Sequence, residues 1–179
     1  MRIALFGGSF NPPHIGHVLA ASHVLATHEP DQLWVMPAFR HPFGKPLAPF
    51  EDRVRMCELA FANLIGRVVV SRIEAEVDGD GTTVTVLEHL MRRFHDVKLS
   101  LVIGADILPE RPKWKDFARI SELAEVIAIG RAGYPGRETG LALPEVSSTE
   151  IRARLSSGEP VAGLVPASVA TYIRMRGLY

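Results

Sequence analysis

The chain has 179 residues, 20 of them basic and 20 acidic, so its formal net charge is zero. This length suffices for one domain, residues 1–179, and the balanced charge argues against a broad nucleic-acid-binding face. The single cysteine, Cys57, excludes an internal disulfide and suits a reducing cytoplasm, where we expect the protein to act. Since no apolar run approaches the length of a membrane span or a signal peptide, we expect no membrane partner.

The first elements of the chain are a strand, a glycine turn and a helix. Residues 3–6 form an apolar run typical of a buried parallel strand. An amphipathic pattern then predicts a helix that begins at Pro13 or His14 and ends near Thr27. Backbone N–H groups and a helix N-terminus meet at such a turn, which suits a phosphate. The stretch Gly7–His17 is therefore predicted to bind a nucleoside triphosphate.

Two histidines lie within this stretch. His14 and His17 are three residues apart, so on a helix they share a face, with Cβ atoms roughly 5–6 Å apart. Gly16 lies between them and lets a ligand approach the backbone. Protonated imidazoles can donate hydrogen bonds to phosphate oxygens. For a lone His-x-x-His pair, two surface histidines at a helix start are the more common arrangement, and a zinc pair is a weaker third interpretation.

The rest of the chain alternates strands and helices. Strands are predicted at 32–36, 67–71, 98–103 and 125–129, with a short sixth at 141–143. Helices are predicted at 50–65, 83–94, 149–155 and 166–175, a short helix within 114–123, and an acidic, turn-rich segment at 74–81. This alternation predicts an α/β fold, a single-domain Rossmann-like doubly wound parallel sheet with helices on both faces.

Ligands of doubly wound sheets bind beyond the carboxyl ends of the strands. Four segments follow predicted strands and are expected to line one crevice: 7–17, 37–45, 104–114 and 130–134. In the second of them, the basic run Arg40–Lys45 can close over an anion, although a solvated surface loop is the simpler interpretation. In the third, Asp106 can accept hydrogen bonds from ribose hydroxyls. Trp114 can stack on an aromatic base or fill the core, and the core is the safer interpretation.

A second candidate phosphate site is the run Ser147–Arg152. A serine before a helical pattern is typical of an N-cap. The functional interpretation is a second helix N-terminus directed at phosphates, with Arg152 one turn into the helix. The alternative is a cap followed by a solvated arginine, and spacing alone leaves the two equal. The functional interpretation gains weight if this run faces Gly7–His17.

Together these residues carry a resemblance. Gly7–His17 resembles the signature of the nucleotidyltransferase superfamily with its His-x-Gly-His box, and Ser148–Arg152 resembles its second box. Within that superfamily the chain is most similar to bacterial nicotinate-nucleotide adenylyltransferases. Further similarities are Gly104-Ala105-Asp106 followed by Lys113-Trp114, the stretch 130–135, and the ending Gly177-Leu178-Tyr179.

The resemblance implies adenylyl transfer from ATP to nicotinate mononucleotide, which gives deamido-NAD and pyrophosphate in NAD biosynthesis. The mononucleotide phosphate would attack ATP in line, without a covalent intermediate, and Mg²⁺ would neutralise the triphosphate. No metal-ligating residues of the protein are expected. The implied residues are the catalytic His14, His17 and Arg152; for ATP, Gly8, Ser9, Lys45, Gly104, Asp106, Ser148 and Thr149; and for the acceptor, Thr83, Trp114 and Lys115.

The chain departs from the family pattern near the acceptor. The usual tyrosine before Thr83 is Thr82, a later threonine is Val86, and the residue after the stacking tryptophan is Lys115 rather than tyrosine. These changes affect the choice between nicotinate and nicotinamide mononucleotide. Our hypothesis is that Lys115, or backbone amides near Thr83, favours the nicotinate carboxylate.

Several other functions share parts of this pattern. Sister transferases that use nicotinamide mononucleotide, phosphopantetheine or CTP share the first box. Class I aminoacyl-tRNA synthetases share the His-x-Gly-His letters, but the chain has no net basic charge and no Lys-Met-Ser-Lys-Ser loop. An inactive nucleotide sensor would be expected to lack one of the boxes, and both are present. The partners expected are small molecules and no nucleic acid; the oligomeric state, homo-oligomers included, is left open.

Overall fold

The molecule is built around one parallel sheet with helices on both sides. We describe a computed structural model, which covers residues 1–179 except 41–43, 45, 65, 78–80 and 131–142. The sheet has five strands in the order β3-β2-β1-β4-β5, and all neighbouring pairs are parallel. The strands are β1 (Arg2–Gly8), β2 (Gln32–Pro37), β3 (Val68–Val70), β4 (Lys98–Gly104) and β5 (Ala124–Ile129).

The helices alternate with these strands along the chain. They are α1 (Ile15–Thr27), α2 (Phe50–Ala60), α3 (Ile73–Glu76), α4 (Thr83–Arg93), α5 (Phe117–Leu123), α6 (Ser148–Ser157) and α7 (Ala167–Arg176), with 3₁₀ turns η1 (Ala62–Leu64) and η2 (Ala105–Lys113). The order of the strands reverses between β1 and β4, so the predicted doubly wound fold is confirmed. None of the described helices is long and apolar enough to cross a membrane.

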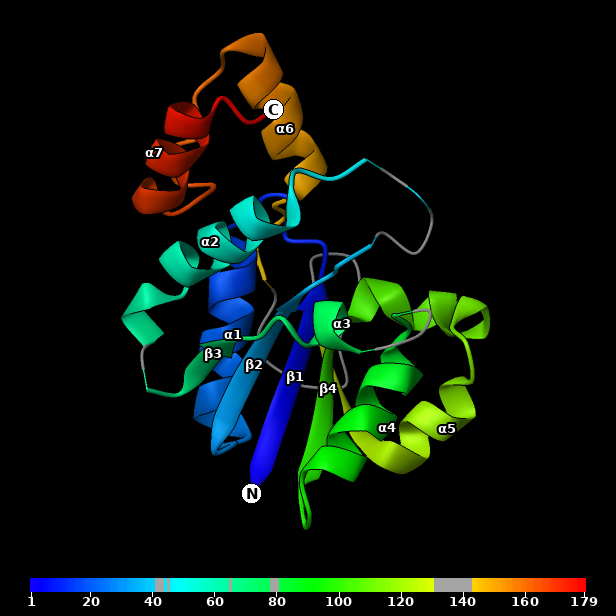
Figure 1. Cartoon of the computed structure of the whole chain (residues 1–179). Helices are drawn as coiled ribbons and strands as arrows, with labels where there is room; N and C mark the ends of the chain where they lie inside the picture. The colour runs from blue at the N-terminus through cyan, green and yellow to red at the C-terminus, as the bar shows by residue number, and fades with distance from the viewer. Residues whose placement is uncertain (41–43, 45, 65, 78–80, 131–142) are drawn as a thin grey trace.

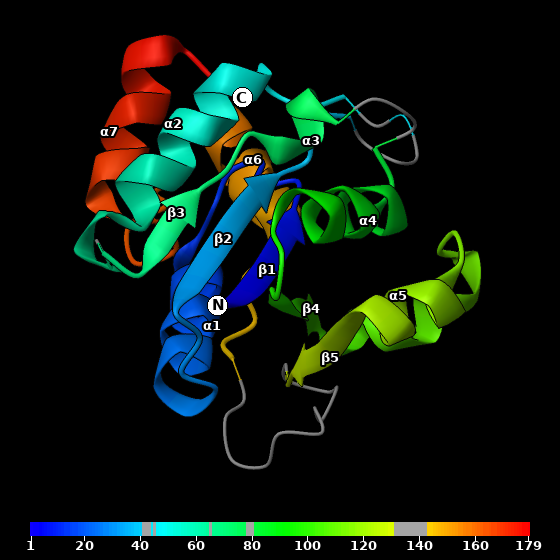
Figure 2. The same cartoon turned by 60° about the horizontal axis from the view of Figure 1, so that its bottom comes forward.

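The alternation of side chains along β1 divides the core into two layers. Ala4 and Phe6 belong to the layer under α1, α2, α6 and α7, whereas Ile3 and Leu5 belong to the layer under α3, α4 and α5. Figure 2 shows α1, α2 and α7 on one side of the sheet and α4 and α5 on the other. Both faces of the strands are thus covered, which explains why the strands have apolar runs rather than alternating patterns.

The two closing helices lie beyond the carboxyl ends of the strands. Figure 1 shows α6 and α7 above the tips of β1 and β2, with the C-terminus beside α6. On α2, Asp52 accepts hydrogen bonds from Tyr172 (2.7 Å) and from Arg176 (3.0 Å), both on α7. The Tyr172 hydrogen bond, with help from Arg176 and against burial, holds the pKa of Asp52 below its usual value. This contact ties α7 to α2.

Two details of local structure differ from the predictions, and one prediction is confirmed. The segment 74–81 was expected to be turn-rich, but α3 occupies its first residues from Ile73 on, and four residues are too few to show a helical period. The short helix expected within 114–123 is α5, which begins at Phe117, because Asp116 caps it and η2 precedes it. The helix expected to reach Ile65 ends at Ala60, before η1. Of the expected strand at 141–143, Leu141 and Ala142 lie outside the described residues, while the Leu143 N–H donates to the Gly130 carbonyl at 3.2 Å.

Candidate functional site

The turn between β1 and α1 is shaped by a buried phenylalanine. Phe10 is 1% exposed, and its ring packs edge-on against Phe6 with 5.6 Å between the ring centroids. Its φ of +44° lies in the left-handed region, which costs a residue with a side chain roughly 1–2 kcal/mol. A Cβ on Gly8 would lie 3.3 Å from the Phe10 ring, closer than most real contacts of this kind. The turn therefore needs a glycine at position 8 and packing that holds Phe10 in place.

The two histidines of this turn stack on each other. The ring centroids of His14 and His17 are 3.7 Å apart and the ring planes differ by 28°. Nδ1 of His17 accepts a hydrogen bond from the His14 backbone N–H at 3.1 Å. When neutral, the His17 ring therefore carries its proton on Nε2, so its outer edge is a hydrogen-bond donor. The prediction that the two rings share a face is confirmed, and His17 has the donor that a phosphate oxygen requires.

The space beside Gly16 is filled by another side chain of the protein, the His14 imidazole. A Cβ at this position would lie 3.1 Å from two atoms of the His14 ring. We expected this glycine to let a ligand approach the backbone. Gly16 does line the cleft, and the structure adds a second reason for the glycine, because the missing side chain makes room for the buried His14 imidazole, which is 2% exposed.

The second predicted phosphate site lies directly against the first. The Ser148 hydroxyl donates to the Pro12 carbonyl at 2.8 Å, and Nη1 of Arg152 donates to the Asn11 carbonyl at 2.8 Å. Nη2 of Arg152 also donates to Oγ1 of Thr149 at 3.2 Å. Ser147–Arg152 therefore faces Gly7–His17, which is the arrangement that favours the functional interpretation of this run over a simple helix cap. The first-turn N–H groups of α6, which have no intrahelical acceptors, therefore lie next to the turn.

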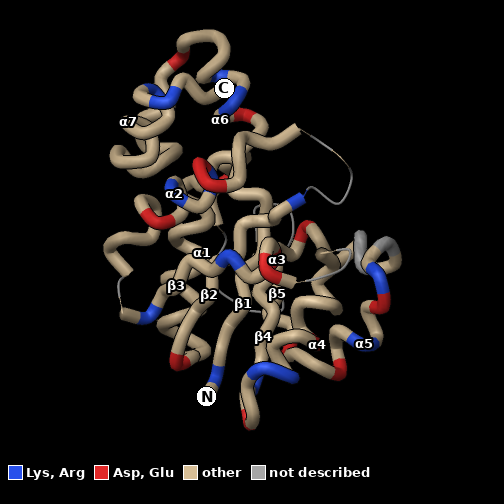
Figure 3. Tube along the Cα trace, in the orientation of Figure 1, with Lys and Arg blue, Asp and Glu red and all other residues tan. Residues whose placement is uncertain are grey.

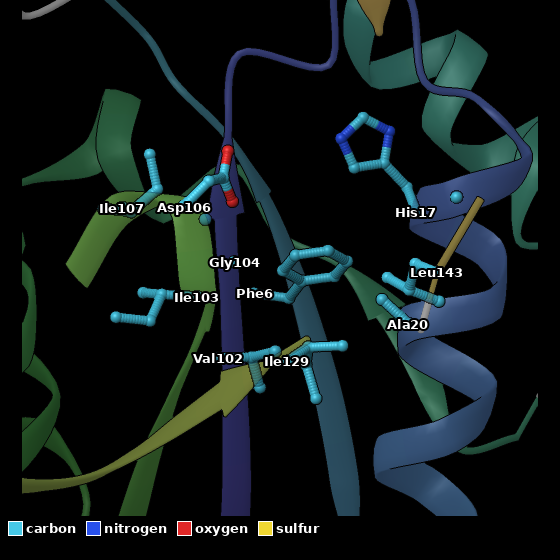
Figure 4. A pocket seen from close by; sticks show the side chains of 12 residues that line it. Phe6, His17, Ala20, Val102, Ile103, Gly104, Asp106, Ile107, Ile129 and Leu143 are labelled. Carbon is cyan, nitrogen blue, oxygen red and sulfur yellow. The ribbon is translucent and has the colours of Figure 1, made fainter. Parts of the chain in front are cut away.

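A cleft of about 190 Å³ opens beside His17 between β1, β4 and α1. Figure 4 shows His17 and Asp106 on opposite sides of the cleft, with apolar side chains between and below them. An apolar floor suits a base, a carboxylate suits ribose hydroxyls, and the imidazole suits a phosphate. The cleft is lined by Phe6, Gly7, Gly16, His17, Ala20, Val102, Ile103, Gly104, Asp106, Ile107, Ile129 and Leu143.

The expected crevice is thus confirmed for the segments that follow β1 and β4, while the described residues of the 37–45 segment, 37–40 and 44, are absent from its lining. Lys45 lies outside the described residues, as do residues 131–134 of the last expected segment. Thr83, the first residue of α4, and the exposed Lys115 are also absent from the lining. Trp114 is partly buried, with its ring 6.1 Å from that of Phe117, so one part of the ring packs on the core while another part stays accessible.

Sequence reasoning missed two buried polar residues that hold the turn. Oδ1 of Asn11 accepts hydrogen bonds from the Ala48 N–H (3.0 Å) and the Tyr179 hydroxyl (2.7 Å). Arg53 on α2 is 1% exposed and donates to the Ser9 carbonyl at 3.0 Å. A signal for Arg53 did exist, since it falls four positions before Cys57 on the apolar face of a predicted helix. For the Tyr179 contact, 168 residues away, no local pattern exists.

The single thiol plays no part in this arrangement. Cys57 is fully buried in the layer under α2, and burial raises its pKa well above the ordinary value. A thiol in this state is a poor nucleophile, so the site must work without one. Among the described residues no three His, Cys, Asp or Glu side chains gather to hold a metal ion. Figure 3 shows Lys and Arg interspersed with Asp and Glu along the described trace.

Comparisons with known proteins agree with this geometry. The profile of the cytidylyltransferase-like family matches residues 5–154. A protein named probable nicotinate-nucleotide adenylyltransferase from Myxococcus xanthus is 50% identical over 180 residues, covering 100% of this chain and 95% of that protein. Its namesake from Anaeromyxobacter dehalogenans (strain 2CP-C) is 52% identical over 181 residues, covering 99% and 96%. The Plasmodium falciparum nicotinic acid mononucleotide adenylyltransferase complexed with NaAD has the same fold, with a TM-score of 0.85, 17% identity and 99% and 97% coverage.

A carboxyl group on α3 has an unusual acidity. Glu74 on α3 accepts a hydrogen bond from the Phe39 N–H at 3.1 Å, at the start of the loop that follows β2. Burial raises its pKa from 4.5 to about 7, against the opposing effects of the Phe39 hydrogen bond and the charge of Arg53. The folded protein therefore holds a proton on Glu74 at pH values where the unfolded chain has lost it.

We predict that Glu74→Gln removes a pH dependence of stability. The contribution of the wild-type side chain is fully present below pH 4.5 and is lost as the pH rises through about 7. The variant keeps the acceptor oxygen but cannot ionise. Above pH 7 its free energy of unfolding should therefore exceed that of wild type by about 2 kcal/mol, so the variant is the more stable protein there. Urea unfolding of both proteins from pH 5 to 8 measures this difference. Parallel stability curves over that range would show that the proton is not linked to folding.

Proposed function

The chain belongs to the cytidylyltransferase-like family, among the nicotinate-nucleotide adenylyltransferases, and on this premise we propose that it transfers the adenylyl group of ATP to nicotinate mononucleotide. The products are deamido-NAD and pyrophosphate, a step of NAD biosynthesis. We further propose that residues 1–179 form one nucleotidyltransferase domain, which acts in the cytoplasm on small molecules.

We base the proposed function on one feature of the structure, the junction of two helix N-termini. The hydrogen bonds from Ser148 and Arg152 to the β1–α1 turn bring the N-termini of α1 and α6 to the same place, beside His17. Two helix N-termini, an imidazole donor and a guanidinium form a positive site built for several phosphate groups. An apolar cleft that ends in Asp106 adjoins it, as a nucleoside requires.

The chemistry needs no protein nucleophile. An oxygen of the mononucleotide phosphate forms a bond to the α-phosphorus of ATP, and the bond from that phosphorus to the bridging oxygen of the β-phosphate breaks. Charge then builds on the α-phosphate oxygens and on the departing pyrophosphate, so catalysis consists of positioning and charge stabilisation. Alignment of the two phosphates alone can lower such a barrier by about 7–11 kcal/mol.

The residues take the following roles in this proposal. His17 donates from Nε2 to the phosphates, His14 orients it, and Arg152 adds positive charge. The turn at Gly8 and Ser9, the first-turn N–H groups of Ser148 and Thr149, and Lys45 hold the triphosphate, while Gly104 and Asp106 hold the ribose. Thr83, Trp114 and Lys115 belong to the acceptor side. In this proposal Mg²⁺ enters as part of the substrate, bound to the triphosphate.

We predict that wild-type protein releases pyrophosphate fastest with ATP and nicotinate mononucleotide. A coupled pyrophosphate assay with ATP or CTP, against nicotinate mononucleotide, nicotinamide mononucleotide and phosphopantetheine, compares kcat/KM across the whole set. The family pattern and the adjoining nucleoside cleft favour the first pair. Faster turnover with CTP or with phosphopantetheine would replace the proposed reaction by that of a sister transferase, and tight ATP binding without turnover on any acceptor would indicate a nucleotide sensor.

Lys115→Ala tests which residue selects the acceptor. An exposed ammonium group near the pyridine ring would attract the nicotinate carboxylate, so its loss should lower kcat/KM for nicotinate mononucleotide about 5- to 10-fold and leave nicotinamide mononucleotide unaffected. The ratio of the two kcat/KM values is the measurement. An unchanged ratio would rule out the lysine and leave the amides near Thr83 as the candidate.

His17→Ala should lower kcat about 100-fold or more, because removing one preorganised donor to a developing charge typically has an effect of this size. The fold should remain intact, since His17 lies at the cleft rather than in the core. Circular dichroism and the pyrophosphate assay check the two statements together. The exposed His95 provides a control, and His95→Ala should keep full activity. Activity of the His17 variant within a few-fold of wild type would remove this residue from the proposed chemistry.

A further inference from the structure

A buried arginine stands directly behind the phosphate-binding turn. The Arg53 side chain on α2 is 1% exposed, although most arginines lie at the surface. Burial lowers its pKa, yet among the described residues it forms no ion pair with a carboxylate. Its guanidinium instead hydrogen-bonds two backbone carbonyls, Nε to Ala48 at 2.9 Å and Nη1 to Ser9 at 3.0 Å. An apolar side chain could fill this space without the cost of burying a charge, so the arginine must contribute through its polar contacts, which are these hydrogen bonds and a cation–π contact 5.5 Å from the centroid of the Phe50 ring.

These contacts are part of a closed ring of hydrogen bonds. Ala48 accepts from Arg53 through its carbonyl and donates through its N–H to Oδ1 of Asn11 at 3.0 Å. Asn11 lies two residues after Ser9, which the same guanidinium holds. The ring therefore fixes Ser9 and Asn11 relative to each other and to α2. The third residue of the turn, Phe10, is held between two fixed points.

The Phe10 ring directly contacts the ring of His17, the proposed catalytic histidine. The centroids of the Phe10 and His17 rings are 4.8 Å apart, in an edge-to-face arrangement. The Ser9–Phe10 peptide is trans, so a Ser9 carbonyl that points at Arg53 directs the Phe10 N–H to the opposite side. A shift of the Ser9 carbonyl would rotate this peptide and move the ring that supports His17.

We propose that Arg53 is a positioning residue for adenylyl transfer, and that it acts by holding the Ser9–Phe10 peptide and, through Phe10, the His17 imidazole. This inference rests on the proposed function. Arg53 itself reaches neither the cleft nor the reacting atoms, since it is buried behind the turn. Its effect is therefore expected on the transition state, for which alignment matters most, more than on the binding of ATP.

The test compares Arg53→Met and Arg53→Lys with two controls, one on α2 itself and one on α7, which contacts α2. Arg55→Met removes an exposed arginine that pairs with Glu58 at 3.0 Å. Tyr172→Phe removes the hydrogen bond to Asp52 on α2, so it loosens this helix without touching the turn. For each protein, kcat and KM for ATP and the mononucleotide are measured together with the melting temperature.

Arg53→Met should lower kcat about 30- to 100-fold while KM for ATP changes by less than about 3-fold. The kcat of Arg53→Lys should lie between the kcat values of Arg53→Met and wild type, because an ammonium group keeps the charge but lacks the rigid, planar set of donors that bridges two carbonyls. Both controls should keep kcat within about 2-fold of wild type, even where Tyr172→Phe lowers the melting temperature.

For this comparison each variant is assayed at the same number of degrees below its own melting temperature. The inference is overturned if kcat of the Arg53 variants is then within about 3-fold of kcat of Tyr172→Phe. If Arg53→Met does not fold, Arg53→Lys decides alone by the same comparison. Wild-type protein that releases no pyrophosphate with any acceptor would instead contradict the proposed function, so the two failures are distinguishable.

Discussion

The contact between α6 and the β1–α1 turn is the interaction on which the rest of the site depends. Ser148 and Arg152 donate to the carbonyls of Pro12 and Asn11, and these hydrogen bonds join parts of the chain that are 136 and 141 residues apart. Either helix N-terminus alone would be a common feature of any α/β protein. We propose that their junction combines two weak anion sites into one site for a chain of phosphates. The turn therefore needs to be rigid, and the structure provides that rigidity from several directions.

The sheet brings these parts together through its topology. Because all described strands run parallel, their carboxyl ends lie at one edge, and the reversal of order between β1 and β4 leaves a cleft there. Behind the turn, Arg53 on α2 binds the Ser9 carbonyl, and Tyr179 hydrogen-bonds Asn11 at 2.7 Å. The same helix is tied to α7 through Asp52. The contacts that reach the turn itself come from Arg53 on α2, from Ser148 and Arg152 on α6, and from Tyr179.

Much of this could be predicted from local sequence, and the rest could not for definite physical reasons. Apolar runs such as Ile3–Phe6 identify buried strands, and the glycine turn with two histidines identifies an anion site, because both signals are contained within a few residues. The four-residue helix α3 has no period to detect. The role of Gly16 depends on where the His14 ring packs, and the hydrogen bond of Tyr179 depends on the complete fold. Long-range contacts of buried polar groups are the part that sequence patterns miss.

We propose that the joined site transfers the adenylyl group directly from ATP to the mononucleotide. A single turnover with protein in excess over ATP radiolabelled at the α-phosphate tests this. It is quenched at successive times in alkaline detergent, which preserves an adenylylated histidine, and the protein is then precipitated with cold acetone. Direct transfer predicts that the label passes from ATP to deamido-NAD only when nicotinate mononucleotide is present, and that the precipitated protein stays unlabelled throughout. Label that remains on the protein, or that leaves ATP without an acceptor, would contradict the claim.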